Sequence, residues 1–545
     1  MIVRLLRSLG WVILAGSVGV FVAVTIAEAA QGPEASQSLR LTARMWQSYR
    51  TSILMAAGAT ALAMTIAVPV AAGLVHARGP WRRGVLLALT ILPLLTMPNV
   101  FTYSWMLLGS SPVGVIRAAM STLGWNARGA AAFQAAWVLG TWLWPIPALL
   151  LMAGYRHIGA RAHRLACLDA TPVQAFVRGA LPAMRPTILA AGAVVFVLVM
   201  TDSTVPALMT ATDTWSYQVM TDARDAMRFA RPAAFMFWRS WPMLATLVVM
   251  VAAAAPGLRQ MASWGSAPES SEMGTASLSV RWIWPPAVAL AAGLTVLPAT
   301  VFVMELVIGR TSLEELMQRG FGVVGQAAAG TVIVAALAGL AAVLAALVTV
   351  GGSIGSRPSR VGSVVVIVLL GVATMPPELI ATALVGCYAR IGDPATWNLY
   401  DDTPWVWTAA MVARFAFIPA CVAHLLDRRL GRETSAQAAV DGADRLQRIA
   451  YARLPMLWRP LAGAGLIVGC LAISEVACSV LVQPVRFFRG SLAVMIDNQM
   501  HYGREAMVIA CSLLLMVPAA VTAVMIPWLA GLRRVGQTHA APARP

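Results

Sequence analysis

Four charged residues interrupt long apolar runs of this 545-residue chain: Asp202, Glu378, Arg414 and Glu475. A charged side chain inside the hydrocarbon of a bilayer costs about 2.5–3.5 kcal/mol on insertion scales, so each is a candidate for function. Asp202 and Glu475 occupy related places in the sequence and could form a two-carboxylate gate or a relay for a cation. Pairing with Arg239, with Arg414 or with the backbone would instead make them structural bridges.

Glu378 follows the pair Pro376-Pro377 within an apolar run, where a helix must break. The break predicts either a site in a transport pathway or a kink that serves packing, and Arg414 could neutralise Glu378 or Glu475. Two polar segments flank such runs. The loop 390–403 with its three aspartates could receive a binding protein or attract cations, or it could be a solvated face, and 213–229 is expected to form a short interfacial helix.

Two polar segments between apolar runs share a sequence pattern. A loop between membrane spans does not need such a pattern merely to be solvated. The segment 436–455 reads AQAAVDGADRLQRIAYARLP, and 163–182 reads HRLACLDATPVQAFVRGALP. Both end in Leu-Pro, and an Arg-Pro pair follows each. We call these segments the second and the first cassette. Ala436–Ala439 is expected to begin a helix, and Gly442 to permit a sharp bend because glycine accepts backbone angles that other residues resist.

The elements that position these residues are apolar helices. The chain is 59% hydrophobic and 12% charged with a mean hydropathy of +0.74, which is typical of polytopic membrane proteins. A spanning helix needs about 20 apolar residues. Twelve runs qualify: 10–30, 51–77, 85–108, 130–153, 187–210, 239–256, 282–308, 326–351, 361–389, 404–426, 460–482 and 506–530. The expected fold class is therefore an all-α polytopic membrane protein.

The net charge of +17 indicates membrane topology rather than nucleic-acid binding. All 40 basic residues are arginine, and most fall in alternate loops on the side of the N-terminus. This bias predicts cytoplasmic N- and C-termini, with inner-leaflet lipid as a further partner. The segment 1–29 also resembles a cleavable signal peptide, but the repeat described next favours its retention as a span.

Internal repetition predicts two halves of six spans each. Asp202 matches Glu475, Leu181-Pro182 matches Leu454-Pro455, and Thr96-Met97-Pro98 matches Thr374-Met375-Pro376. Because six is even, both halves cross in the same sense, related by a pseudo-twofold axis along the membrane normal. The expected domains are a first half at 1–256, a cytoplasmic linker at 257–281, a second half at 282–530 and a tail at 531–545. The coupling loops are expected at 157–182 and 430–455.

Several kinds of chemistry find no support in the sequence. A P-loop and a Schiff base both need a lysine, and the chain has none. The six cysteines stand singly and the six histidines lack ligand spacing, so neither a metal nor another cofactor is expected. There is no catalytic constellation in a soluble segment, so the chain is not expected to be an enzyme. If nucleotide drives it, another subunit binds the nucleotide.

The cassettes resemble the EAA loop of the membrane subunits of binding-protein-dependent ABC importers, whose pattern is Glu-Ala-Ala-x-x-x-Gly and, further on, Ile-x-Leu-Pro. Aligned on Leu454-Pro455, the glycine falls on Gly442, and the Glu-Ala-Ala positions hold Ala-Gln-Ala. In the first cassette the glycine position holds Asp169. The resemblance implies that the residues coupling to an ATPase subunit are Asp169, Ala170, Ala438, Asp441, Gly442, Ala443, Leu454 and Pro455.

The resemblance extends over the whole chain, since a fused pair of six-span units is similar to the ferric-iron class of these permeases. It implies two copies of a nucleotide-binding ATPase subunit, an extracytoplasmic solute-binding protein and a place in the bacterial inner membrane. Thiamine, phosphonate and polyamine are the other solutes considered. A major-facilitator-type carrier also has twelve spans in two sets, but it would not need the two cassettes. A membrane enzyme or flippase is the third hypothesis.

Overall fold

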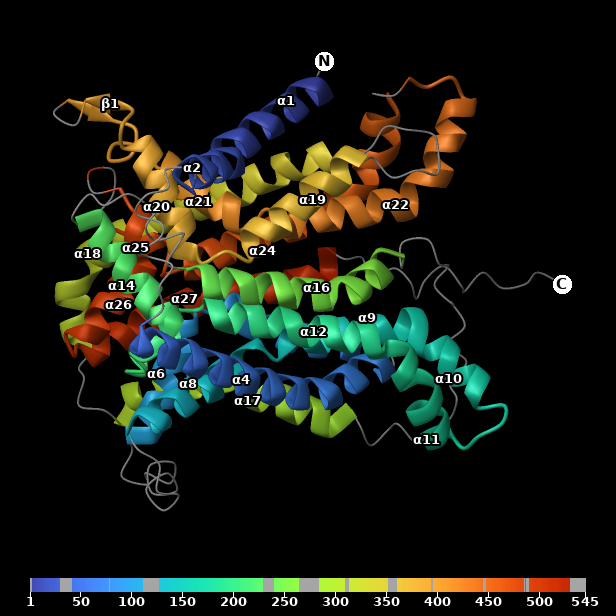
Figure 1. Ribbon diagram of the computed structural model, residues 1–545, viewed down its shortest axis with the longest axis horizontal. Helices are drawn as coiled ribbons and strands as arrows, with labels where there is room; N and C mark the ends of the chain where they lie inside the picture. Colours follow the sequence, from blue (N-terminus) through green and yellow to red (C-terminus); the bar gives the residue numbers. More distant parts are fainter. Residues whose placement is uncertain are drawn as a thin grey trace.

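The computed structural model describes residues 2–29, 42–77, 79–110, 127–228, 240–263, 284–308, 313–350, 360–393, 396–444, 447–484, 486 and 490–529. Nearly all of these residues are helical, as the apolar runs predict, because a helix satisfies every backbone polar group within its own segment. The described chain is that of an all-α polytopic membrane protein. Long helices run side by side along the length of the molecule, and short helices lie at its ends (Figure 1).

The first part of the chain contains the following helices. They are α1 (Ile2–Leu14), η1 (Ala15–Gly19), α2 (Val20–Ala29), α4 (Ala43–His76), α5 (Pro80–Leu95), α6 (Pro98–Ser110), α8 (Ala127–Leu143), α9 (Pro145–Gly154), η2 (Tyr155–Gly159), α10 (Ala160–Ala166), α11 (Pro172–Ala175), η3 (Phe176–Ala180), α12 (Leu181–Thr201), α13 (Thr204–Leu208), α14 (Trp215–Arg228) and α16 (Trp241–Ser263). The segment expected to form a short helix at 213–229 is α14.

The second part repeats much of this order. It contains α17 (Trp284–Ile308), α18 (Leu313–Ala346), η6 (Leu347–Thr349), α19 (Arg360–Ala373), α20 (Pro377–Tyr388), β1 (Gly392–Asp393), β2 (Trp397–Asn398), α21 (Trp405–Phe415), α22 (Phe417–Val440), η7 (Arg448–Arg453), α24 (Leu454–Ser474), α25 (Ser479–Val482), α26 (Leu492–His501) and α27 (Glu505–Leu529). The antiparallel pair β1–β2 lies in the loop 390–403. There the Asp402 carboxylate accepts the Asn398 N–H at 2.7 Å and faces Arg486 at 3.8 Å.

Among the described residues, seven helices are long and apolar enough to cross a membrane. Four further pairs of helices would each make one broken span, which gives up to eleven. The expected span 239–256 forms α16, whose apolar part Trp241–Gly257 is shorter than the others. Twelve spans therefore stay a prediction. Residues 257–263 of the expected linker continue α16, whereas 264–281, the tail 531–545 and Arg239 lie outside the described residues.

Sharp bends recur at corresponding places. The pair α5–α6 bends by 92° and α19–α20 by 103°, while α8–α9 and α21–α22 bend by 44° and 47°. The break before Glu378, expected from Pro376-Pro377, is confirmed by the 103° bend. Helices α12 and α24 both begin at Leu-Pro, both have 21 residues and both end at an acidic residue with φ −79°. The same series of elements thus occurs twice.

The first long helix of each series packs against the other series. Helix α17 contacts α4, α5 and α6, whereas α1 contacts α18 and α2 contacts α20. Figure 1 shows α17 beneath α4, and α1 above the opposite part of the bundle. The two parts of the chain are therefore interlocked rather than merely adjacent. Small residues permit this close packing, since a Cβ on Gly10 of α1 would clash with the Leu344 carbonyl oxygen in α18.

Candidate functional site: two cassettes and a charged cluster

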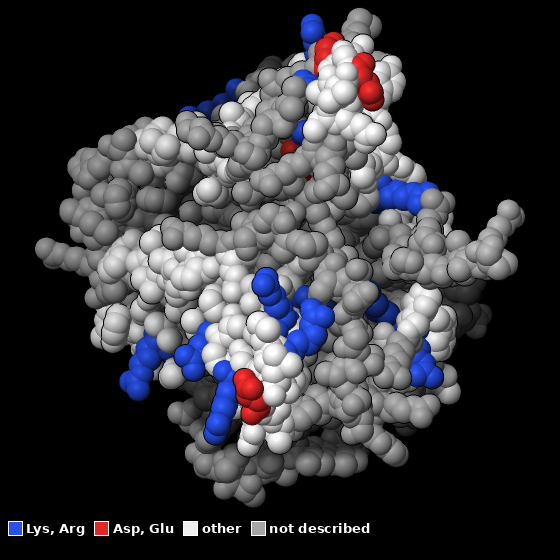
Figure 2. Space-filling view, turned by 90° about the vertical axis from the view of Figure 1, so that its right-hand side faces the viewer, with Lys and Arg blue, Asp and Glu red and all other residues white. Residues whose placement is uncertain are grey.

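Both cassettes lie at the same end of the helix bundle. Figure 1 shows α10 and α11 at that end, together with the far end of α22 and the turns that follow it. Figure 2 looks onto this end: arginine side chains are spread across it, and acidic side chains are fewer and gathered in two main places. The opposite end of the bundle holds the short helices α14 and α26 and the β1–β2 pair (Figure 1).

The second cassette turns sharply at Gly442, as the sequence predicts. Gly442 has φ +82°, which a side chain rarely tolerates. Its N–H donates to the Ala439 carbonyl at 3.1 Å, and the Ala443 N–H donates to the Ala438 carbonyl at 2.9 Å. This pair of bonds is the Schellman ending of a helix. The expectation that Ala436–Ala439 begins a helix is wrong: these residues form the last turn of α22, because that helix continues from Phe417 through the polar stretch 427–435 without a break.

A capping box starts the next helical segment of each cassette. The Asp444 carboxylate accepts the Gln447 N–H at 2.7 Å, and the Gln447 side chain accepts the Asp444 N–H at 2.8 Å. Thr171 and Gln174, which stand at the same spacing before Leu-Pro in the first cassette, make the same two bonds at 3.4 Å. Sequence reasoning missed both boxes, although a Thr or Asp followed three residues later by Gln is a recognised start signal. The signal lies in Thr-Pro-Val-Gln and Asp-Arg-Leu-Gln.

The second cassette encloses a surface groove of about 370 Å³. Its lining residues are Ala438, Asp441, Gly442, Ala443, Gln447, Tyr451 and Ala452. Four of the predicted coupling residues are thus brought together there. Tyr451 is 81% exposed and Val440, next to Asp441, is 87% exposed. Both side chains present apolar surface beside the groove.

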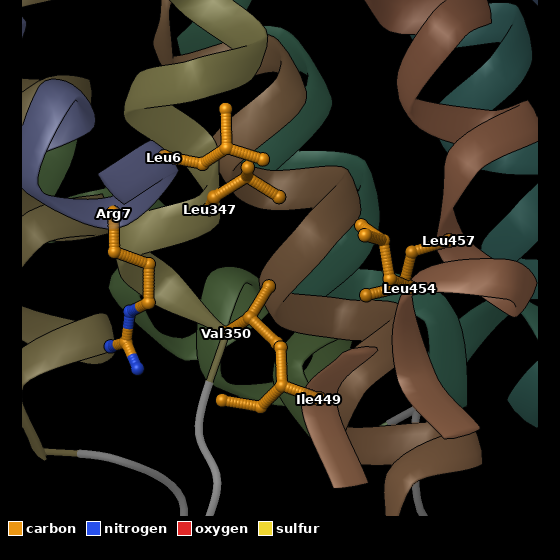
Figure 3. A pocket seen from close by; sticks show the side chains of 7 residues that line it. All are labelled: Leu6, Arg7, Leu347, Val350, Ile449, Leu454 and Leu457. Atoms are coloured by element: carbon orange, nitrogen blue, oxygen red, sulfur yellow. The ribbon is translucent and has the colours of Figure 1, made fainter. Parts of the chain in front are cut away.

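Leu454 and Pro455 lie elsewhere, at the start of α24. Leu454 lines a small apolar recess with residues from α1, from η6 and from η7. Figure 3 shows Leu6, Leu347 and Leu454 pointing toward this recess from three elements. Arg7 at its edge donates to the Val348 carbonyl at 3.4 Å. The second cassette is thereby packed against the N-terminal helix.

The first cassette also turns at the position that corresponds to Gly442, but no residue of that turn has a left-handed backbone conformation. Asp169 takes the place of Gly442, and its N–H donates to the Ala166 carbonyl at 3.3 Å, the counterpart of the Gly442–Ala439 bond. The only non-glycine residue with positive φ in the described chain is Thr210. Asp169 and Ala170 therefore do not have positive φ. Leu168 is 79% exposed beside them, so this cassette also presents an apolar side chain.

Different contacts anchor the two cassettes. Arg453 Nη1 and Asp427 Oδ1 form a nearly buried ion pair at 2.6 Å between η7 and α22. In the first cassette, the Tyr155 hydroxyl and His163 Nδ1 share a hydrogen bond at 2.8 Å, and both rings pack against Phe176. Tyr155 and Asp427 stand equally far along the chain from the starts of α9 and α22, so one residue of each anchor occupies an equivalent place.

The four charged residues predicted within the membrane come together in space. Arg414 Nε contacts Glu475 Oε2 at 3.1 Å, with side chains 19% and 10% exposed. Glu378 is 1% exposed and accepts a hydrogen bond from the Ser203 hydroxyl. Arg414 and Glu475 act electrostatically on both Glu378 and Asp202. We call Asp202, Ser203, Glu378, Arg414 and Glu475 the charged cluster.

Asp202 and Glu475 have equivalent local structures. Each follows the last residue of a long helix, α12 or α24, in extended conformation. The Asp202 carboxylate accepts the Val205 N–H at 2.9 Å, and Glu475 accepts the Cys478 N–H at 3.1 Å. Each carboxylate thus bridges a helix break to the short helix beyond it. Arg414 also neutralises Glu475 rather than Glu378, a choice that the sequence left open.

A second polar contact joins the two series of helices at the end opposite the cassettes. Asn99 in α6 donates to the Asp497 carboxylate in α26 at 3.1 Å, and both side chains are buried. Asn99 is the second residue of α6, as Glu378 is of α20. Sequence reasoning missed this contact and also missed Ser203 as a partner of Glu378. Neither has a local signal, because the partners are far apart in the sequence.

Among the described residues, no group of three or more His, Cys, Asp or Glu side chains is placed to hold a metal ion. The charged cluster contains the Arg414–Glu475 ion pair and hydrogen bonds from Ser203, Val205 and Cys478 to its carboxylates. Comparison with known proteins gives no match to a family model, a curated protein or a solved structure.

Proposed function

We propose that this chain is the membrane permease of an ATP-driven importer, built from two tandem six-span halves. Two ATPase subunits dock at the cassettes in the cytoplasm, and a soluble receptor delivers the solute at the opposite face. The observation that carries the proposal is the recurrence of one polar device in both series: a capping box, a π-helical turn and Leu-Pro leading into a 21-residue helix. A carrier driven by an ion gradient has no need for it.

The second cassette supports docking most directly. Its groove is open, its turn is held by two backbone bonds and a capping box, and Tyr451 and Val440 are exposed beside it. A partner helix or loop that fits this groove would bury apolar surface, the main driving force for association. The helix α24 then extends about 30 Å from the cassette to Glu475, at 1.5 Å per residue.

The proposed mechanism is alternating access. Closure of the two ATPase subunits on nucleotide draws the cassettes together and opens the pathway outward, and hydrolysis reverses the movement. The solute crosses between the halves, where Asp202 and Ser203 of one half meet Glu378, Arg414 and Glu475 of the other. We propose ferric iron as the solute, with thiamine next. Specificity in such a machine lies largely with the receptor, a separate chain.

The test is uptake of labelled ferric iron by cells with the gene, without it, and with Gly442→Arg. Gly442 has positive φ and open space around it, so the arginine would strain the turn by about 1–2 kcal/mol and occupy the docking surface. Gly503→Arg is the matched control, since Gly503 has φ +65°, is exposed and also has open space, but lies after α26 at the opposite end.

We expect uptake to be lost in the deletion and in Gly442→Arg, and to persist in Gly503→Arg. Normal uptake with Gly442→Arg would contradict docking at the second cassette. Normal uptake in the deletion strain would remove iron as the solute, and labelled thiamine would be tested in the same three strains.

A further inference from the structure

The charged cluster contains three carboxylates, from Asp202, Glu378 and Glu475, around one arginine. Arg414 is the basic side chain that acts on both Asp202 and Glu378, and it contacts Glu475 directly. Like charges held together in a medium of low dielectric repel one another strongly, and a nearby cation relieves that repulsion. The position of Arg414 therefore decides whether these carboxylates attract other cations.

The equivalent position in the first half shows that the fold does not need an arginine there. Trp142 is the second-last residue of α8, as Arg414 is of α21, and a shallow bend follows each. The Trp142 indole N–H donates to the Pro93 and Thr96 carbonyls at 2.8 and 3.1 Å, where α5 ends. The neutral Trp142 side chain thus satisfies backbone carbonyls at the 92° bend between α5 and α6. The charge of Arg414 has a purpose that bending alone does not explain.

The carboxylates of the charged cluster explain why a positive charge is present at Arg414. Asn99, a neutral residue, occupies in α6 the place that Glu378 occupies in α20. The second half has Glu378, Arg414 and Glu475 where the first half has Asn99, Trp142 and Asp202. The positive charge thus occurs in the half that supplies two of the three carboxylates.

We propose that Arg414 is a tethered counter-ion that closes the charged cluster to small cations in the state described here. The proposal rests on the function proposed above, because it requires the cluster to face a pathway between the halves. A guanidinium beside Glu475 meets an approaching proton or potassium ion with like charge. Without it, three carboxylates would concentrate cations at the boundary of the two halves.

The Arg414–Glu475 ion pair, which closes the cluster to cations in this proposal and which we call the seal, is also connected to the second cassette. Arg414 lies at the end of α21, just before α22 begins, and Glu475 lies just after α24 ends. Both α22 and α24 lead to the second cassette. A movement of that cassette changes the separation of Arg414 and Glu475, so the seal opens only when the cassette moves.

The test is passive ion flux through the purified full chain in vesicles of phosphatidylethanolamine and phosphatidylglycerol, with a potassium gradient and an entrapped pH-sensitive dye. The variants are Arg414→Gln and Arg414→Lys. Arg486→Gln is the control, since Arg486 is an exposed arginine that pairs with Asp402 outside the spans. We expect Arg414→Gln to raise proton or potassium flux about tenfold, the factor that accompanies a change of about 1.4 kcal/mol in a barrier. Arg414→Lys and Arg486→Gln should stay close to the unmodified chain.

Flux through Arg414→Gln equal to that of the unmodified chain overturns the proposal. If that variant does not purify as a folded protein, Arg414→Gln combined with Glu475→Gln removes the whole ion pair and leaves Asp202 and Glu378 without their counter-ion. This double variant should also leak, and a tight double variant likewise overturns the proposal. The vesicles contain neither ATPase nor solute. Failure of the seal is therefore distinguished from failure of the importer proposal, which the uptake experiment tests.

Discussion

Two helical hairpins with the same backbone course are held by different chemistry. The first hairpin runs from α9 through the first cassette to α12, and the second from α22 through the second cassette to α24. The second has an ion pair at each end, Asp427–Arg453 beside the cassette and Arg414–Glu475 at the far end. In the first, Tyr155 and Trp142 stand at the positions of Asp427 and Arg414, but Tyr155 bonds to His163 and Trp142 bonds to carbonyls at the end of α5.

The two hairpins differ in how firmly their contacts hold them. A nearly buried ion pair tolerates little displacement, because separating its charges leaves each uncompensated in a medium of low dielectric. Packed rings and a neutral hydrogen bond can shift at lower cost. The second hairpin is thus braced by an ion pair at each end, whereas the contacts of the first resist displacement less. This asymmetry agrees with the cassettes, since only the second has the left-handed glycine at its turn.

The largest expected effect comes from removing one partner of the ion pair near the second cassette. Arg453→Ala leaves the Asp427 carboxylate nearly buried without its cation, and such a loss costs about 3–5 kcal/mol of unfolding free energy. Tyr155→Phe in the first hairpin removes one neutral hydrogen bond, which is worth about 0.5–1.5 kcal/mol. Unfolding of both variants by denaturant in detergent measures the difference.

Equal losses in the two variants would contradict the contrast between a stiff and a compliant hairpin. Replacing both partners, with Asp427→Leu and Arg453→Met, sharpens the comparison. A well-packed apolar pair often matches the stability of an ion pair, so this double variant should regain stability while uptake stays impaired if directional bracing matters.

An intermediate effect is expected from the two capping boxes. Asp444→Ala should cost about 1 kcal/mol, the usual value of a lost N-cap. Thr171→Ala should cost less, because its hydrogen bonds at 3.4 Å are near the limit of useful length. Amide hydrogen exchange at Gln447 and Gln174 reports each loss locally. A greater loss of protection in Thr171→Ala than in Asp444→Ala would show the first cassette to be the more tightly held.

The smallest effect concerns the contact between Asn99 and Asp497. Asn99 is neutral and stands in α6 where Glu378 stands in α20. Helix α26 lies outside the candidate spans. Burial raises the pKa of Asp497, while His501, Arg224 and the hydrogen bond from Asn99 offset part of that rise. A raised pKa in the folded state means that the protonated form is favoured. The stability it contributes is full below the unfolded pKa of about 3.9 and is lost as pH rises through the folded pKa.

Asp497→Asn should therefore raise the melting temperature at neutral pH, and the gain should vanish near pH 4, about the unfolded pKa. Melting in detergent at the two pH values checks this. A variant that is less stable than the unmodified chain at neutral pH would show that attraction to Arg224 outweighs the cost of burial.

Much of the local structure was predictable from neighbouring residues. Pro376-Pro377 predicts the break before Glu378, and Gly442 predicts the turn of the second cassette, because proline and glycine restrict or release the backbone where they stand. The same reasoning went wrong at Ala436–Ala439. Small residues are compatible with either end of a helix, and the preceding run through α22 decided that they end one. The capping boxes were predictable but overlooked.

The partners of the charged residues could not be predicted in the same way. Asp202, Glu378, Arg414 and Glu475 were recognisable one by one, since an ionisable residue in an apolar run stands out. That Arg414 pairs with Glu475 and that Ser203 reaches Glu378 depends on how α12, α20, α21 and α24 pack. No spacing rule relates residues so distant in the sequence.

Neighbouring residues along the chain are enough to specify the apolar helices, their breaks at proline, the left-handed turn at Gly442 and the presence of charge within apolar runs. These follow from hydrophobicity and backbone preference, which act over a few residues. The packing of the helices, by contrast, is what brings α1 and α17 to the opposite series, places Asn99 against Asp497, and gives ion pairs to one hairpin and not to the other. Such pairings depend on the bends at the helix breaks, from 44° at α8–α9 to 103° at α19–α20, and a change in any bend would bring different side chains together.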